Sequence, residues 1–302
     1  EGTEDITENM RKRGGGILDI ELVDMTDKEP GYYQLKATFN TVDSMGANFI
    51  NSCLEEFASI LRSWVATQDI FEGKEKDVFV IMSILSNYTP ECLVKVWVDC
   101  PIEELGTFEG GMTAEDFAWR FSKVVKIAQV DPHRATTHNK GIYNGIDSVV
   151  IATGNDFRAV EACGHTYAAR SGQYSSLTDV SIENGHFKFS IEVPMALGVV
   201  GGLTSLHPMV KNALEILGNP SAEELMMIAA TIGLANNFGA LKSLTTTGIQ
   251  KGYMKMHLLN ILNSFDATFQ EKQEAIVYFK DKKVSHSSVR AYLDEVREKQ
   301  QA

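Results

Sequence analysis

The sequence is short of paired cysteines, of long apolar runs and of basic charge. Its four cysteines show neither C-x-x-C pairing nor histidine–cysteine metal spacing, so we expect reduced thiols and no metal site. No apolar run approaches the roughly 20 residues that span a bilayer, so we expect a soluble chain with no membrane segment. The formal net charge of -12 argues against partners that need a basic face, namely nucleic acid and membrane surfaces. A local basic patch for an anionic cofactor is compatible with this charge.

The start of the chain, EGTEDITENMRKRGGG, is polar and has no apolar segment of the kind found in a signal peptide. We therefore expect a cytoplasmic protein. The missing initiator methionine suggests a processed product or a fragment. The length of 302 residues suits two modest domains or one large domain with an insertion, and the hydrophobic content of 44% is enough for a sizeable core.

Apolar periodicity near the N-terminus predicts a small sheet with a helix packed on it. Residues 17–23 and 33–42 alternate apolar and polar side chains as paired strands do, and 78–84 is a further predicted strand. An amphipathic helix is expected from 49 to about 67. This order favours an antiparallel sheet with a packed helix over an alternating parallel sheet.

Most of the remaining chain is predicted to be helical. Two β features interrupt the helices: an apolar β-like segment at 148–153, and a hairpin whose turn is Asn184-Gly185. The predicted fold class is therefore α+β, with a larger part that is mainly helical. The expected helices are 114–128, one that starts near Asp156 and runs through 160–170, 208–217, 222–236, 238–246, 270–280 and 287–300.

The stretch DPHRATTHNKGIYNGIDSVVIATGNDFRAVEA at 131–162 holds the residues best suited to catalysis. Lys140 lies before the apolar segment of this stretch, and Asp156 lies in the turn after it. Where two such residues converge, the ammonium group steadies a developing oxyanion and the carboxylate sets its proton affinity. The plain alternative is a surface lysine and a helix-capping aspartate, which composition alone favours.

Several long motifs in one order resemble the hydroxymethylglutaryl-CoA reductase family, in its soluble bacterial form known as class II. The likeness reaches from about Gly14 to Asn260. The strongest carriers are GGG at 14–16, DSMGAN at 43–48, DPHRATTHNKGIYNGID at 131–147 and ATGNDFRAVEA at 152–162. Weaker carriers are HTYAARSGQYSSLT at 165–178, PMALGVVGGLTSLHP at 194–208 and GLANNFGALKSL at 233–244. Ordered motifs of this length are far more specific than any single glycine pattern.

The resemblance implies an oxidoreductase that interconverts hydroxymethylglutaryl-CoA and mevalonate plus CoA, with NAD or NADP as the cofactor. It implies catalytic roles for Lys140 and Asp156, and contacts of Arg134 and Asn144 with the acyl substrate. A guanidinium such as that of Arg134 forms bidentate hydrogen bonds with a carboxylate, and hydroxymethylglutarate has such a group. The resemblance also implies a homodimer with its active site at the subunit interface.

Two of these residues have competing structural interpretations. Arg134 could instead form an ion pair with Asp131 or Asp147. Asn144 is about as plausible as a turn-capping residue as it is as a substrate contact.

By the same resemblance, DSMGAN is the dinucleotide-binding motif of a small non-Rossmann domain. The motif lies between a predicted strand and a predicted helix, so its backbone amides can face a phosphate at the helix N-terminus. Gly46 would let the cofactor approach the backbone closely. On these six residues alone, a tight turn with a helix cap is the better interpretation. Only the resemblance of the other motifs to the family favours cofactor binding instead. The implied cofactor contacts are Asp43, Met45, Gly46, Ala47, Asn48 and, further along, Asn87.

Two departures from the family bear on activity. Tyr253 stands where the resemblance places an acid-donating histidine of a C-terminal flap. A phenol has a reference pKa of about 10 against about 6.5 for imidazole, so tyrosine is the poorer proton donor to a departing thiolate. His257, one helical turn later, is interpreted as a surface or CoA-adjacent residue. The family's catalytic glutamate, in an ENVIG-like motif, has no counterpart in this chain.

The sequence therefore supports a reductase and, as the alternative, an impaired relative that binds CoA or nucleotide without efficient turnover. An unrelated dehydrogenase that shares only a cofactor loop is disfavoured by the motifs downstream of that loop. We expect a small cofactor-binding domain at 1–86, a larger acyl-CoA-binding catalytic domain at 87–248, and a mobile, helical C-terminal flap at 249–302.

Overall fold

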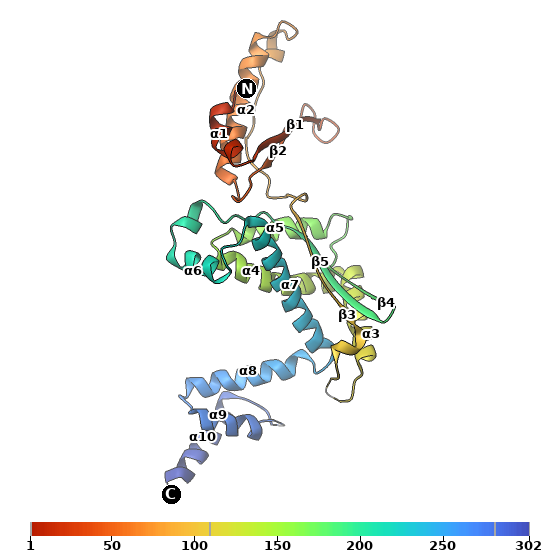
Figure 1. Cartoon of the computed structure of the whole chain (residues 1–302), viewed down its shortest axis with the longest axis vertical. Coiled ribbons are helices and arrows are strands. Elements are labelled where there is room, and N and C mark those ends of the chain that lie inside the picture. The colour runs from red at the N-terminus through yellow and green to blue at the C-terminus, as the bar shows by residue number, and fades with distance from the viewer. Residues whose placement is uncertain (1, 109, 281, 302) are drawn as a thin grey trace. The chain divides into compact units, whose positions relative to one another are not determined.

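The computed structural model describes residues 2–108, 110–280 and 282–301, without the side chains of 205, 249–255 and 299–301. Figure 1 labels the helices and strands along the chain. The helices are α1 (Glu4–Lys12), α2 (Ala47–Thr67), α3 (Ala114–Val130), α4 (Pro132–Ala152), α5 (Phe157–Ala168), α6 (Pro208–Ile216), α7 (Ala222–Thr245), α8 (Ile249–Ser264), α9 (Phe269–Tyr278) and α10 (His286–Gln301). The strands are β1 (Gly16–Asp24), β2 (Tyr33–Asn40), β3 (Leu93–Pro101), β4 (Thr178–Glu183) and β5 (His186–Pro194). Short 3-10 helices are η1 (Gly73–Lys76), η2 (Ile102–Leu105) and η3 (Gly202–Ser205).

The described strands form two small sheets. β1 and β2 pair antiparallel, with Leu22 opposite Leu35. The second sheet has the strand order β3-β5-β4. The hairpin between β4 and β5 turns at Asn184 and Gly185, whose φ angles of 52° and 76° are the left-handed values that a tight hairpin turn needs. With the helices around them, these sheets confirm the predicted α+β class.

The chain divides into two compact units. The first comprises Glu1–Val98, Ile127–Val180 and Phe189–Asn236, and the second comprises Asp99–Lys126, Ser181–Lys188 and Asn237–Ala302. The domain boundaries predicted at 86 and 248 rest on expected function rather than on compactness, and they stay a prediction.

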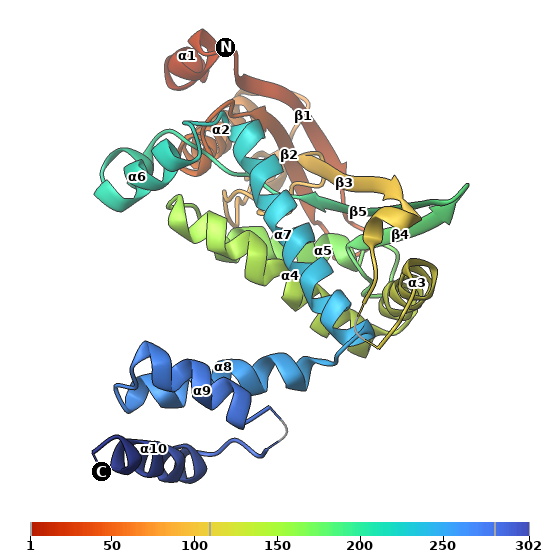
Figure 2. The same ribbon diagram turned by 60° about the horizontal axis from the view of Figure 1, so that its bottom comes forward.

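α4 is the central helix of the first unit. It begins at the N-cap Asp131, whose carboxylate accepts a hydrogen bond from the amide of His133 at 3.0 Å, and proline occupies its first position. Gly145 lies against α7: a Cβ there would come within 2.5 Å of the carbonyl oxygen of Ile232. α4 and α7 therefore pack closely, side by side, as Figures 1 and 2 show. The buried face of α4 includes Ala135, Ile142, Ile146 and Val150.

The β-like segment predicted at 148–153 is wrong, because α4 continues to Ala152. Val150 is fully buried in the helix, and the hydroxyl of Thr153 donates to the carbonyl oxygen of Val149 at 2.8 Å. Adjacent β-branched residues lower helix propensity by only a few tenths of a kcal/mol each. Burial of one valine side chain contributes about 1.5–3 kcal/mol, so packing outweighs the local preference.

The strand predicted at 78–84 is also wrong. Within the part of the chain that the structure describes, this segment is not paired in a sheet. Phe79 and Ile81 are 85% and 73% exposed. The segment is instead tied to α2 at its end, where the amide of Leu85 donates to Oδ1 of Asn51 at 3.0 Å.

The two helices predicted at 222–236 and 238–246 are one continuous helix, α7. Asn237, at the predicted break, is 1% exposed and helical. Among the described residues α7 is the helix long and apolar enough to cross a membrane by length and composition alone. That is weak evidence, because the core helix of a soluble protein meets the same test.

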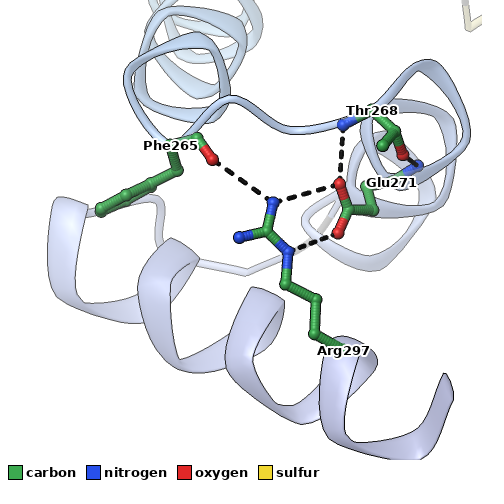
Figure 3. Close-up of polar contacts among 4 residues, drawn as sticks. All are labelled: Phe265, Thr268, Glu271 and Arg297. Atoms are coloured by element: carbon green, nitrogen blue, oxygen red, sulfur yellow. Dashed lines mark hydrogen bonds and ion pairs between the residues drawn. The ribbon is translucent and has the colours of Figure 1, made fainter. Parts of the chain in front are cut away.

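In the second unit, α8, α9 and α10 lie together around their own apolar core. Figure 3 shows the ion pair that joins α9 to α10: Nε of Arg297 donates to Oε1 of Glu271 at 2.6 Å. Nη2 of Arg297 also donates to the carbonyl oxygen of Phe265 at 3.3 Å, and the amide of Thr268 donates to Oε2 of Glu271 at 2.6 Å. Glu271 is 4% exposed, and its hydrogen bonds with Arg297 and then with the amide of Thr268 lower its pKa to about 2. The core comprises Leu258, Ile261, Leu262, Ala267, Ala275, Phe279, Val284, Val289, Tyr292 and Leu293.

We expect Glu271→Gln to destabilise the chain at neutral pH by about 1.5–3 kcal/mol, because the amide loses charge-assisted bonds to Arg297. A lowered carboxyl pKa contributes stability that is present above the unfolded value of 4.5 and is lost as the pH falls through about 2. The difference from wild type, measured by thermal unfolding, should therefore shrink across that window. Glu274→Gln, on the exposed side of α9, is the matched control and should change little. Equal destabilisation by the two variants would contradict the role of the pair.

Candidate functional site

Three of the sequence motifs meet at Gly198, in the loop between β5 and η3. The amide of Gly198 donates to Oδ1 of Asn155 at 2.8 Å, and its carbonyl oxygen accepts from Nδ2 of Asn155 at 3.0 Å. The amides of Val199 and Val200 donate to the carbonyl oxygen of Asp43 at 2.8 and 3.3 Å. The DSMGAN loop, the GVVGG loop and the turn before α5 are therefore joined by hydrogen bonds.

The contact at Gly198 leaves no room for a side chain. A Cβ on Gly198 would come within 2.5 Å of the backbone nitrogen of Met45 and 3.0 Å of the carbonyl carbon of Ser44. These are backbone atoms, which cannot move aside as a flexible side chain would. Glycine at this position is what lets the two loops touch.

Some DSMGAN residues hold the loop in place, and others are at least partly exposed to solvent. The carboxylate of Asp43 accepts from the amide of Ala222 at 2.9 Å, so it caps the start of α7. Gly46 is the N-cap of α2 and has a φ of 76°, in the left-handed region that favours glycine. Met45 and Ala47 are half-buried, and Asn48 is exposed.

The N-terminus of α2 is suited to an anionic group. Its N-cap, Gly46, provides no side-chain hydrogen bond, and its first turn contains no acidic residue. The first amides of a helix carry partial positive charge and have no partner within the helix. A dinucleotide's diphosphate fits this end of α2 by the chemistry of its donors.

Lys140 and Asn144 lie one turn apart on the exposed face of α4. Asn144 is in the middle of the helix, so the turn-capping interpretation of this residue is wrong. Lys140 forms no ion pair with any residue that the structure describes. In this single chain it matches the surface lysine that composition favoured.

Asp156 is the N-cap of α5, as expected, and accepts from the amides of Arg158 and Ala159 at 3.0 and 3.4 Å. Its carboxylate also binds the guanidinium of Arg158, with Nε to Oδ1 at 3.0 Å and Nη2 to Oδ2 at 2.9 Å. The bond to Arg158 is the main reason that the pKa of Asp156 is lowered. The structure therefore brings Asp156 together with Arg158 and not with Lys140.

Arg158 and Asn155 are the site residues that the sequence interpretation missed. Both lie within ATGNDFRAVEA, directly beside Asp156. An arginine two residues after a helix-capping aspartate lies within reach of that carboxylate, so this pair had a local signal. The contact between Asn155 and Gly198 joins residues far apart in the sequence and had none.

Arg134 is half-buried in the first turn of α4, and burial lowers its pKa. The competing ion pairs with Asp131 and Asp147 do not form in the described part of the chain. Asp131 binds the amide of His133 instead. Arg134 is therefore not committed to either of these aspartates.

Two further predicted residues lie outside this junction. Asn87 is exposed, two residues before Thr89, whose amide donates to Sγ of the buried Cys163 on α5 at 3.4 Å. Tyr253 falls in α8, and its side chain lies outside the described residues.

The chain matches the family described as hydroxymethylglutaryl-coenzyme A reductase over residues 1–258. The 3-hydroxy-3-methylglutaryl-coenzyme A reductase of Archaeoglobus fulgidus is 37% identical over 289 residues, which are 94% of this chain and 61% of the relative. A probable reductase of Borreliella burgdorferi is 32% identical over 264 residues, 86% of this chain and 57% of the relative. The chain belongs to the hydroxymethylglutaryl-CoA reductase family, in class II.

The solved structures that this chain resembles are reductases of the same family. A class II reductase from Streptococcus pneumoniae bound to NADPH is 34% identical, with a TM-score of 0.71 over 81% of this chain and 63% of that chain. A second structure of the Streptococcus pneumoniae reductase has a TM-score of 0.72 over 98% of this chain and 68% of that chain. The chain thus spans about 60% of the length of the curated relatives it matches, 61% and 57% of the two.

We expect Gly198→Ala to destabilise the chain by about 1–3 kcal/mol, because the methyl group has to displace backbone atoms of the DSMGAN loop. Urea unfolding measures the change. Gly239→Ala in α7 is the matched control: a Cβ there meets nothing within 4 Å, and alanine favours a helix, so this variant should be neutral or slightly stabilised. A neutral Gly198→Ala would show that the two loops are not in close contact.

Proposed function

We propose that this chain is an oxidoreductase that interconverts hydroxymethylglutaryl-CoA and mevalonate plus CoA, with NAD or NADP as the cofactor. The observation that carries the proposal is the hydrogen-bonded junction at Gly198, which places the DSMGAN loop beside the turn that leads into Asp156. A dehydrogenase needs the loop that binds its cofactor to lie next to the groups that donate and accept protons. Family membership and the NADPH named for the Streptococcus pneumoniae structure support the same assignment.

The DSMGAN loop would hold the dinucleotide. The amides at the start of α2 would bind its diphosphate, with Gly46 as the N-cap of that helix. A Cβ on Gly46 would collide with the side chain of Thr41, so glycine at this position serves the packing of the loop. Asn48 and Asn87 are exposed amides that would donate to its polar groups. When bound, the nicotinamide supplies or accepts hydride. Asp43 would act indirectly, because its carboxylate fixes the loop against α7.

The exposed face of α4 would hold the acyl group. The ammonium of Lys140 would donate to the acyl oxygen and stabilise the negative charge that develops there. Arg134, which has no described acidic partner, would bind the substrate carboxylate, and Asn144 would donate to a substrate oxygen. The carboxylate of Asp156 would keep Lys140 protonated once the two are brought together.

We further propose a cytoplasmic homodimer with the active site at the subunit interface. Each chain would contribute a small non-Rossmann cofactor domain at 1–86, an acyl-CoA domain at 87–248 and a helical flap at 249–302. The pairing of Asp156 with Arg158 in the single chain supports this arrangement, because Lys140 then needs a rearrangement or a second subunit to meet a carboxylate.

The second candidate is an impaired relative that binds CoA or nucleotide without efficient turnover. Tyr253 at the family's histidine position favours it, since a phenol is a weaker acid than imidazolium. Calorimetry that shows tight binding of CoA or NAD(P)H, in a chain with no cofactor oxidation, would support this candidate over the reductase.

We expect this chain to oxidise NADH or NADPH in the presence of hydroxymethylglutaryl-CoA, measured by absorbance. Lys140→Ala should lower kcat about a hundredfold to a thousandfold, because it removes the donor to the oxyanion. Lys211→Ala, an exposed lysine of α6, is the control and should retain full activity. Cofactor oxidation that does not depend on the acyl-CoA would refute the proposal.

Tyr253→His should raise the rate of the step that releases the thiolate, because imidazolium is the stronger acid near neutral pH. Single-turnover kinetics with the aldehyde-level intermediate separate this step from the first hydride transfer. Tyr253→Phe is the matched control and should not accelerate it. An unchanged or slower rate in Tyr253→His would contradict the assignment of this position.

A further inference from the structure

The two oxygens of the Asp156 carboxylate are used unequally. Oδ1 accepts from the amide of Arg158 at 3.0 Å, from the amide of Ala159 at 3.4 Å and from Nε of Arg158 at 3.0 Å. Oδ2 accepts from Nη2 of Arg158 at 2.9 Å, and this is its one hydrogen bond within the residues that the structure describes. An ionised carboxylate offers about four lone-pair directions, shared equally between its oxygens. Oδ1 is therefore fully engaged, whereas Oδ2 can accept a further donor.

The guanidinium of Arg158 fixes the plane of this carboxylate. The helix-capping bonds from the amides of Arg158 and Ala159 reach Oδ1 alone, so by themselves they constrain one oxygen. Nε and Nη2 of Arg158 add a bond to each oxygen, and a bidentate contact of this kind sets the orientation of the whole group. The direction in which Oδ2 can accept its further donor is therefore determined by the arginine.

Arg158 contributes little to packing. Its side chain is 77% exposed, whereas that of Asp156 is 33% exposed. The side-chain hydrogen bonds and the ion pair that the structure describes for Arg158 all go to Asp156. Ion pairs at such exposure add little to the free energy of unfolding. The arginine is thus better explained by its effect on the carboxylate than by its effect on the fold.

The bond to Arg158 also controls the charge of Asp156. The hydrogen bond from the Arg158 side chain is the largest of the effects that lower the pKa of Asp156, burial opposes it, and the capping amides reinforce it. In return, the carboxylate raises the pKa of Arg158. Arg158 is the charged group that shifts this carboxyl group among the described residues. It therefore keeps Asp156 ionised when a bound substrate excludes water.

We propose that Arg158 is a positioning residue of the candidate site: it holds Asp156 by both oxygens and leaves Oδ2 one open direction for the ammonium of Lys140. Lys140 then joins the carboxylate without displacing the arginine, so that one carboxylate binds two cations. The full use of Oδ1 and the spare capacity of Oδ2 favour this addition over an exchange in which Arg158 has to leave first. The role in catalysis rests on the proposed function, whereas the bidentate contact does not.

Carbon-13 NMR of the whole chain, with aspartate labelled at its carboxyl carbon, tests the bidentate contact without turnover. The signal of Asp156 is the one that is lost in Asp156→Asn. Arg158→Met keeps the length and the helix propensity of the side chain, and it should raise the pKa of Asp156 towards the ordinary 3.8. Arg158→Lys, which keeps the charge without the planar fork, should raise this pKa less. Arg120→Met, in an exposed arginine of α3, is the matched control and should leave the titration unchanged. An Asp156 titration that is the same in wild type and Arg158→Met overturns the proposal.

Steady-state kinetics test the positioning role. Arg158→Met should lower kcat about tenfold to a hundredfold, because a misdirected carboxylate places the ammonium of Lys140 wrongly, and KM for the acyl-CoA should stay nearly the same. Arg158→Lys should recover part of the loss. The thermal midpoint of both variants should remain close to that of wild type, which separates positioning from a structural role. Full kcat in Arg158→Met overturns the role, and so does a raised kcat, which would make the arginine a competitor of Lys140.

A double-mutant comparison shows whether Arg158 acts through Lys140. In the Lys140→Ala chain, Arg158→Met should lower the residual kcat by no more than about twofold, because the ammonium that Asp156 was to receive is already gone. The same loss in both backgrounds overturns the proposal. A wild-type chain without turnover refutes the proposed function and, with it, the catalytic role of Arg158. The NMR titration still decides whether Arg158 holds the carboxylate, because it does not depend on turnover.

Discussion

The contact of Gly198 with the backbone at Ser44 and Met45 is the constraint on which the candidate site depends. Backbone meets backbone there because no side chain intervenes, and Asn155 binds both polar groups of the same glycine. Three loops from distant parts of the sequence thereby acquire fixed relative positions. Helices α2, α5 and α7 start at or next to these loops, so the same contacts also fix the positions of their N-terminal ends. Sites on rigid elements are held more accurately than sites on free loops.

Each unit contains a hydrogen-bonded ion pair that fixes the end or the packing of its helices. Glu271 and Arg297 form such a pair between α9 and α10, in which the described bonds satisfy the buried carboxylate while the side chain of Arg297 is 40% exposed. In the first unit, Asp156 and Arg158 pair at the start of α5, where the carboxylate also caps the helix.

Sequence reasoning found the elements whose signals are local. The capping role of Asp156, the Asn184-Gly185 hairpin, and the helices α2, α3, α5, α6, α9 and α10 follow from caps, turn residues and periodicity, and the structure confirms them. It missed α1, α4 and β3, predicted the segment of α8 only as part of a helical flap, and split α7. In α4 the run around Val150 has the composition of a strand, and only burial against distant residues makes it helical. The contact of Asn155 with Gly198 likewise requires knowledge of the fold.

The segment 78–84 has a consequence for handling the protein. It is unpaired in the described sheets, rich in β-forming residues, and exposes Phe79, Ile81, Met82 and Ile84. An unpaired segment of this composition can pair as a strand with a similar chain, and uncharged apolar stretches do this most readily. Refolding yield should therefore fall with protein concentration, and the intermolecular association should begin at this segment. A single lysine at position 81 would act as a gatekeeper, since it interrupts the apolar run without touching the core.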